Sequence, residues 1–247
     1  MTTTSRDAQI VLDLVDIEKV FGHAPVQVHA LRGVSLQVRA GELVSVMGPS
    51  GSGKSSLLTI AGGLDRPTGG TVRVGEVDLG AASAADVAAV RRRRVGYVFQ
   101  DYNLIPALTA AENVGLPLEL DGVARSEARR AALQALDDVG LTDLADRFPD
   151  QMSGGQAQRV AIARAVVGDR SLILADEPTG ALDTETGDAV MRMLRARVDA
   201  GAAGVLVTHD ARHAAWADRV VFIRDGLIVD DTGTAPRAES LLDEAAS

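Results

Sequence analysis

The segment GPSGSGKS, at residues 48–55, has the residue types and spacing of a loop that binds phosphate. It matches the pattern G-x-x-x-x-G-K-[ST], in which glycines allow successive backbone N–H groups to surround phosphate oxygens. Lys54 is one of two lysines among 25 Lys and Arg residues, and its compact ammonium suits the β and γ phosphates of a nucleotide. The predicted nucleotide contacts of this loop are Gly48, Pro49, Ser50, Gly51, Ser52, Gly53, Lys54, Ser55 and Ser56.

Polar residues follow three further apolar segments, VGYVF, SLILA and GVLVT. Gln100 follows the first, Asp176 and Glu177 follow the second, and His209 follows the third. The segments are apolar throughout, which is typical of parallel strands covered by helices on both faces. Because ligands bind at the carboxyl ends of such strands, we expect these four side chains to converge on the phosphate loop.

Charge and hydrogen-bonding capacity predict a role for each of these residues. Asp176 is the expected anchor for Mg²⁺, with the Ser55 hydroxyl and Gln100 as its other predicted protein ligands. Glu177 is the candidate to orient or deprotonate a water that attacks the γ phosphate. His209 can hydrogen-bond the γ phosphate, and Gln100 can sense the metal or the water from the opposite wall. The predicted chemistry is Mg²⁺-dependent phosphoryl transfer to water.

A second helix start suited to anions lies in QMSGGQAQRVAIARA, at residues 151–165. Ser153 is a plausible N-cap, and Gly154 and Gly155 let backbone N–H groups approach an anion at the positive end of a helix. A chain with one phosphate loop has no evident need for a second phosphate site. The segment therefore raises the question of which phosphate group binds there.

The elements around these motifs predict a parallel α/β sheet with a β-rich entry. Strands are expected at 10–17, 34–38, 43–47 and 71–79, and a helix follows the loop at 54–64. Strands then alternate with helical stretches such as 184–200 and 210–217, which favours a parallel core. Helical periodicity also marks the Ala- and Leu-rich stretch 125–140.

Composition limits the classes of function. The chain has 247 residues, a net charge of −9 and no cysteine, so disulfides and thiol chemistry are excluded and a nucleic-acid partner is not expected. The arginine run at 91–94 is interpreted as a solvated helix end. No segment approaches the roughly 20 apolar residues of a membrane span, and the N-terminus lacks a signal-peptide layout, which predicts a cytoplasmic location.

These motifs, in this order, resemble one family closely: the ATP-binding subunits of ABC (ATP-binding cassette) transporters. The resemblance covers residues 9–230 and includes GPSGSGKS, VFQ, MSGGQ, LILADEP, ALD and VTHD. It implies an α/β fold with a P-loop NTPase (RecA-like) core, an antiparallel β subdomain and an inserted α-helical subdomain that carries MSGGQ. In this division the core and β subdomain take 9–100 and 168–230, the helical subdomain takes 101–167, and an acidic tail occupies 231–247.

The resemblance also assigns residues that the motifs alone do not. It implies that Phe21 stacks on adenine, where the family more often has tyrosine, with an ordinary core position as the less favoured alternative. It implies that Ser153, Gly154, Gly155 and Gln156 contact a nucleotide held by another subunit, and that Asp183 lies near the seam between subunits. Met152 stands where the family usually has leucine, a swap of similar volume.

The resemblance implies ATP and Mg²⁺ as cofactors and a head-to-tail dimer of two identical or related subunits, each covering the other's nucleotide. Segments such as LRGVSL and GGLDRPTGG look most like the branch of lipoprotein-release, macrolide-export and cell-division ATPases, whose partner is an FtsX-like permease. The expected place is therefore the cytoplasmic face of the membrane. The segment 101–120 would receive the coupling helix of that permease, or it is simply a packing segment.

Two rival functions remain at this stage. A soluble ABC-type ATPase acting on nucleic acid or a metallocluster scaffold predicts a coiled-coil insertion, a second cassette or a different signature, and none of these is visible in the sequence. The second rival is a mechanical subunit, in which ATP binding changes the shape of a non-transport partner. It would use the same chemistry as a transporter ATPase and would differ mainly in what the ATP-driven change does to the partner.

Overall fold

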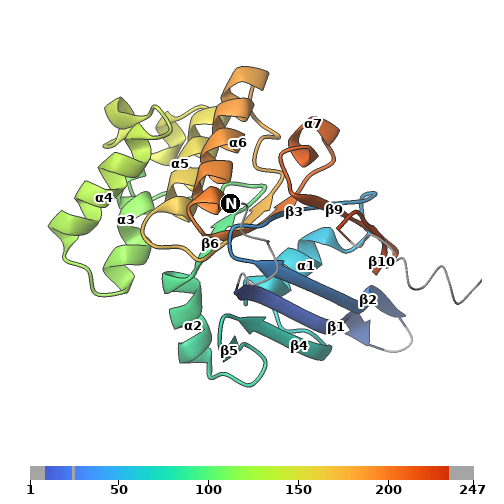
Figure 1. Ribbon diagram of the computed structural model, residues 1–247. Helices are drawn as coiled ribbons and strands as arrows, with labels where there is room; N and C mark the ends of the chain where they lie inside the picture. Colours follow the sequence, from blue (N-terminus) through green and yellow to red (C-terminus); the bar gives the residue numbers. More distant parts are fainter. Residues whose placement is uncertain (1–8, 24–25, 234–247) are drawn as a thin grey trace, which may run out of the picture.

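The structure is a computed structural model that describes residues 9–23 and 26–233. Within these ranges the six-stranded sheet has the order β10-β9-β3-β8-β7-β6 (Figure 1). The pairs from β9 through β6 are parallel, and β10 is antiparallel to β9, so the predicted parallel core is confirmed. The strands are β3 (Leu43–Met47), β6 (Val95–Val98), β7 (Leu172–Asp176), β8 (Ala203–Val207), β9 (Arg219–Arg224) and β10 (Leu227–Asp231).

The second sheet is antiparallel, with the order β2-β1-β4-β5. Its strands are β1 (Ile10–His23), β2 (Val26–Arg39), β4 (Gly69–Val74) and β5 (Val77–Asp78). The hairpin of β1 and β2 is longer than the strands predicted at 10–17 and 34–38, because pairing continues out to His23 and Val26. Its outer half carries mostly exposed side chains, so it lacks the alternation of buried and exposed residues that marks a strand in a sequence.

Helix α1 (Lys54–Ala61) lies between the two sheets and contacts strands of both. Leu57, Leu58 and Ile60 are fully buried in a core that includes Leu12 of β1 and Leu174 of β7. Burial of three large side chains on one short helix stabilises it far more than its intrinsic propensity would. The buried side chains of α1 therefore fix the position of the phosphate loop that precedes it.

Helices α3 (Ala110–Leu120), α4 (Arg125–Asp137) and α5 (Gly154–Val166) gather on one side of the molecule, away from the antiparallel sheet (Figure 1). They share a core of small apolar side chains, including Ala111, Ala132 and Val160. Helix α2 (Ala84–Arg93) ends within the arginine run, as predicted, and Arg93 forms an ion pair with Asp121 at 2.6 Å.

The two helices between the last strands of the core are α6 (Thr184–Asp199) and α7 (Ala211–Ala214). Helix α6 matches its predicted range, whereas the helix predicted at 210–217 has only four residues. It is short because the chain turns at Ala215 to enter β9, where the Asp218 N–H donates to the carbonyl of Leu43 at 2.8 Å.

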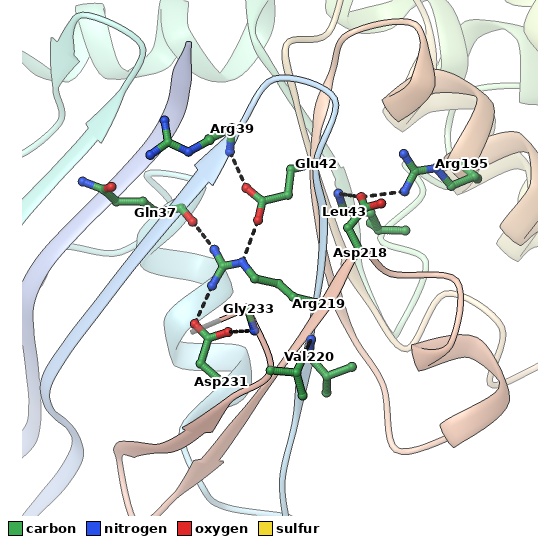
Figure 2. A network of polar contacts seen from close by, with 11 residues as sticks. Gln37, Arg39, Glu42, Leu43, Arg195, Asp218, Arg219, Val220, Asp231 and Gly233 are labelled. Atoms are coloured by element: carbon green, nitrogen blue, oxygen red, sulfur yellow. Dashed lines mark hydrogen bonds and ion pairs between the residues drawn. The ribbon is translucent and has the colours of Figure 1, made fainter. Parts of the chain in front are cut away.

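Arg219 at the start of β9 ties the two sheets together (Figure 2). Its guanidinium donates to Glu42 at 2.6 Å, to Asp231 of β10 and to the backbone carbonyl of Gln37 in β2. A planar guanidinium with five donors can serve three acceptors at once, which an ammonium does less well. The contact fixes the antiparallel sheet relative to the core. Across the described ranges, no helix combines the length and hydropathy needed to cross a membrane.

Candidate nucleotide-binding site

The loop between β3 and α1 adopts a conformation that requires glycine at two positions. Gly48 and Gly53 have φ of 153° and 103°, and a Cβ would lie 2.0 Å from the Ile223 carbonyl oxygen at the first and 2.3 Å from the Ala30 carbonyl oxygen at the second. Gly53 is the N-cap of α1, and no side chain of the described protein caps that helix start. The first backbone N–H groups of α1 are thus available to an anion, as the motif predicts.

Lys54 begins α1 and its ammonium remains at the loop. The ammonium donates to the carbonyl oxygens of Gly48 and Pro49, each at 2.8 Å. These contacts curl the side chain over the loop, so that its charge stands among the backbone N–H groups that would surround a phosphate. Ser52 differs from the other loop serines because it is buried at 3% exposure.

A cleft of about 660 Å³ opens beside the loop, and all four polar residues predicted to converge there line it. Gln100 follows β6, Asp176 ends β7, and Glu177 and His209 follow β7 and β8. Parallel pairing of β6 with β7 and of β7 with β8 brings these strand ends to one edge of the sheet. The lining from the loop consists of Gly48, Ser50, Gly51, Gly53, Lys54, Ser55 and Ser56.

Asp176 and Ser55 form a pair with the donor types that Mg²⁺ prefers. Asp176 is only 8% exposed, and burial raises the pKa of its carboxyl group, opposed by a hydrogen bond from Ser55 and by the charge of Lys54. A cation at this point would reverse the penalty of burying the carboxylate. One carboxylate and one hydroxyl beside open space suit Mg²⁺, which keeps several water or phosphate ligands.

Glu177 is held in a backbone conformation that residues with a side chain seldom adopt, with φ of 46°. Its N–H donates to the Val207 carbonyl of β8 at 2.9 Å, which maintains this conformation at the end of the strand. Its carboxylate accepts a hydrogen bond from Thr208 at 3.3 Å and lies 2.7 Å from Nδ1 of His209. That contact raises the pKa of His209 above its ordinary value. Strain of this kind concentrates at functional sites.

The predicted signature residues lie outside this cleft. Ser153 caps α5 as expected, because its hydroxyl accepts from the Gln156 N–H at 3.3 Å while the Gln156 side chain accepts from the Ser153 N–H at 2.9 Å. Neither these two residues nor Gly154 or Gly155 is part of the described lining of the cleft. A Cβ added at Gly155 would lie 3.3 Å from Cδ2 of Leu182.

Asp183 and Phe21 also lie apart from the cleft lining. Asp183 is the N-cap of α6, and hydrogen bonds from the N–H and hydroxyl of Thr186 lower the pKa of its carboxyl group. Phe21 lies on β1, is 45% exposed, and its ring centroid is 4.9 Å from the Lys19 ammonium. The core position considered for Phe21 is therefore wrong, because the residue is exposed on the antiparallel sheet.

Six residues of the lining were not predicted as site residues: Ala30, Asp101, Gln158, Gly180, Ala181 and Val207. Gln158 is 1% exposed and donates from Nε2 to the Pro178 carbonyl at 2.8 Å. A glutamine within a helix is usually a surface residue, so nothing in the pattern marked it as buried beside Glu177.

Comparison with known proteins decides the family, because the ABC transporter family profile matches residues 31–180, well over half of the chain. The protein belongs to the ABC transporter family. It is an ATP-binding cassette ATPase. The match contains the phosphate loop, Gln100, Ser153 and Glu177 and ends before His209.

Relatives of this cassette include an ABC transporter ATP-binding protein of Thermotoga maritima that is labelled uncharacterized, 49% identical over 88% of this chain and 93% of its own length. A macrolide export ATP-binding/permease protein of Rhodospirillum rubrum is 46% identical over 90% of this chain, which spans only 34% of that relative. A solved structure, the ATP-binding cassette MJ0796 as a post-hydrolysis dimer with ADP and Pi, has a TM-score of 0.85 and 40% identity over 89% of this chain and 97% of its own.

Proposed function

We propose that this cassette binds and hydrolyses MgATP as a dimer and drives a separate membrane permease. The observation that carries the proposal is the separation of two phosphate-binding features. Lys54, Asp176, Glu177 and His209 share one cleft, whereas Ser153 caps a helix outside it. A second copy is the simplest source of a nucleotide for Ser153 to meet, and the pair would be related by a twofold axis.

Each residue of the cleft then has a part in hydrolysis. The loop N–H groups and Lys54 hold the phosphates, and Ser55, Asp176 and Gln100 hold Mg²⁺, whose charge offsets that of the phosphates. Glu177 takes the proton of the attacking water or orients that water, while His209 positions it against the γ phosphate. Phe21 stacks on adenine with its exposed ring.

The signature residues act across the dimer in this proposal. Ser153, Gly154, Gly155 and Gln156 present the start of α5 to the nucleotide held by the partner's loop. Asp183, which caps the next helix in the same region, lies at the seam. The MJ0796 cassette, whose solved structure is a dimer with ADP and Pi, supports this arrangement.

A groove along β6, the edge strand of the core sheet, suits a segment of the permease. It is lined by Leu64, Tyr97, Phe99, Pro117 and Arg164, among others, and the rings of Tyr97 and Phe99 stack at 4.2 Å. Ile105 and Leu120, within the segment predicted to receive a coupling helix, are 39% and 61% exposed. The macrolide export ATP-binding/permease relatives support a permease as the partner, which we propose to be FtsX-like and to hold the cassette at the cytoplasmic face of the membrane.

We also retain the predicted organisation as part of this proposal. Residues 9–230 form a single cassette, in which 101–167 is the helical subdomain that carries the signature. The tail predicted at 231–247 lies mostly outside the described residues, which end at Gly233.

A Glu177→Gln variant tests the proposal, with the wild-type chain as its control. It should bind ATP as tightly as the wild type, lose at least about 100-fold in turnover, and elute as an ATP-bound dimer in size-exclusion chromatography. Normal turnover would remove Glu177 from its role. Wild-type activity per chain should also rise with protein concentration, and a constant value down to strictly monomeric concentrations would refute the shared site.

A further inference from the structure

The turn that follows Glu177 is held by a buried hydrogen bond between two residues that are not part of the cleft lining. Thr179 Oγ1 and His213 Nδ1 lie 2.9 Å apart, and both residues are 7% exposed. Thr179 stands two residues after Glu177, and His213 lies on α7, four residues after His209. The bond therefore joins the chain segments that carry the two polar groups nearest to the attacking water in the proposed mechanism.

Together with the Glu177–His209 contact, this bond links two chain segments at both of their ends, so that the segments and the two contacts form a closed loop. One side of the closed loop is the chain from Glu177 to Thr179, and the other is the chain from His209 to His213. The His209 side chain is 80% exposed, so the contact that it makes with Glu177 can open readily in water. The buried Thr179–His213 bond is the more persistent of the two contacts. Breaking it would leave the Thr179 hydroxyl unsatisfied in the interior and leave His213 Nδ1 only the carboxylate of Asp210, at 3.6 Å.

The surroundings of the pair show that its position is tightly defined. On the side of α6, a Cβ on Gly187 would lie 3.6 Å from Thr179 Cβ and 3.7 Å from His213 Nε2. A separate contact comes from α5, where Gln158 donates to the Pro178 carbonyl at 2.8 Å. The turn therefore has polar contacts from α5 and α7, and of these only the one from His213 comes from the segment that bears His209.

We propose that His213 is a positioning residue for hydrolysis, which acts through Thr179 to hold the Glu177 carboxylate at its place relative to His209. Helix α7 has only four residues and cannot hold its own position by helix propensity. The bond adds a polar tie to the Glu177 turn to the packing of α7 against β3, which buries Ala214. This inference rests on the proposed function, because it assigns His213 a part in the step that Glu177 performs.

Paired variants at both positions test the inference in the full-length chain. Thr179→Val and His213→Leu remove the bond with little change in volume, whereas Thr179→Ser and His213→Asn keep a polar atom in place. We expect the first pair to lower kcat about three- to tenfold while the KM for ATP stays within about twofold. The second pair should keep most of the wild-type kcat. A Val198→Ala variant, which removes buried methyl groups elsewhere, should lower thermal stability without lowering kcat.

The double variant decides whether the two side chains act as one. Thr179→Val/His213→Leu should have the kcat of the weaker single variant, because the shared bond can be lost only once. A kcat that stays at the wild-type value in both single variants, or a double variant that multiplies the two losses, would overturn the inference. Should Thr179→Val fail to fold, His213→Leu against His213→Asn gives the same decision.

Glu177→Gln, assayed in parallel, separates a failure of the proposed function from a failure of the role of His213. Normal ATP turnover in Glu177→Gln would contradict the proposed function. An inactive Glu177→Gln beside fully active Thr179→Val and His213→Leu defeats only the role of His213.

Discussion

The Nδ1 atom of His209 lies 2.7 Å from Oε1 of Glu177, so two residues 32 positions apart in the sequence form a pair at the edge of the nucleotide cleft. Each follows a buried strand, and the pairing of β7 with β8 puts the two strand ends side by side. The geometry gives the candidate base a partner that can stabilise its charge and fix its direction.

The pair makes the protonation of His209 depend on Glu177. Because Glu177 raises the pKa of His209, the protonated pair is complete below the ordinary histidine value of 6.5 and is lost as the pH rises through the raised value. NMR titration should place the His209 midpoint above that of an unperturbed histidine, and Glu177→Gln should lower it. A His209 midpoint that Glu177→Gln leaves unmoved would contradict the pairing.

Loss of the Lys54 ammonium should abolish most of the affinity for nucleotide. Lys54→Ala removes charge-assisted hydrogen bonds to phosphate, so the dissociation constant for ATP should rise about 10- to 100-fold. Isothermal titration calorimetry measures the change, and Arg130→Ala is the control, since Arg130 is a cation on the exposed surface of α4 that pairs with Glu127. Equal increases of the dissociation constant in the two variants would show that Lys54 does not contact the phosphates.

The signature should be needed by the partner's nucleotide rather than by its own. Ser153→Ala should destabilise α5 by about 1 kcal/mol through loss of the cap and should inactivate the homodimer. Mixing inactive Ser153→Ala with inactive Lys54→Ala should restore part of the ATPase activity, because one of the two sites in the mixed dimer contains neither substitution. A mixture as inactive as its components would indicate that Ser153 acts within its own chain.

Removal of the Arg219 guanidinium should loosen the contact between the sheets. Arg219→Met removes the guanidinium that pairs with the carboxylates of Glu42 and Asp231, which are 20% and 17% exposed, and should lower the free energy of unfolding by about 3 kcal/mol. The control is Arg130→Met, whose pair with Glu127 spans 3.9 Å on the surface and should cost less than about 0.5 kcal/mol. Urea denaturation compares the two, and similar losses would contradict the bracing role of Arg219.

Much of the fold and the cleft could be predicted from the sequence because the signals are local. A fully apolar run such as SLILA predicts a buried parallel strand, and the polar residues directly after it must lie at the strand end whatever the rest of the chain does. Ser153 as a helix cap is equally local, since a cap involves only the next few residues. The outer half of the β1–β2 hairpin escaped prediction because its side chains are exposed and its pairing alone defines it.

By itself the sequence determined the chemistry: which loop cradles phosphate, which residues end the core strands, and to which family these motifs belong. Only the tertiary structure decided the contacts behind that chemistry. Gln158 and His213 come from different helices, and both meet the turn after Glu177. No spacing in the chain encodes such meetings, because they depend on how α5 and α7 pack against the sheet, and packing is settled by the whole core at once.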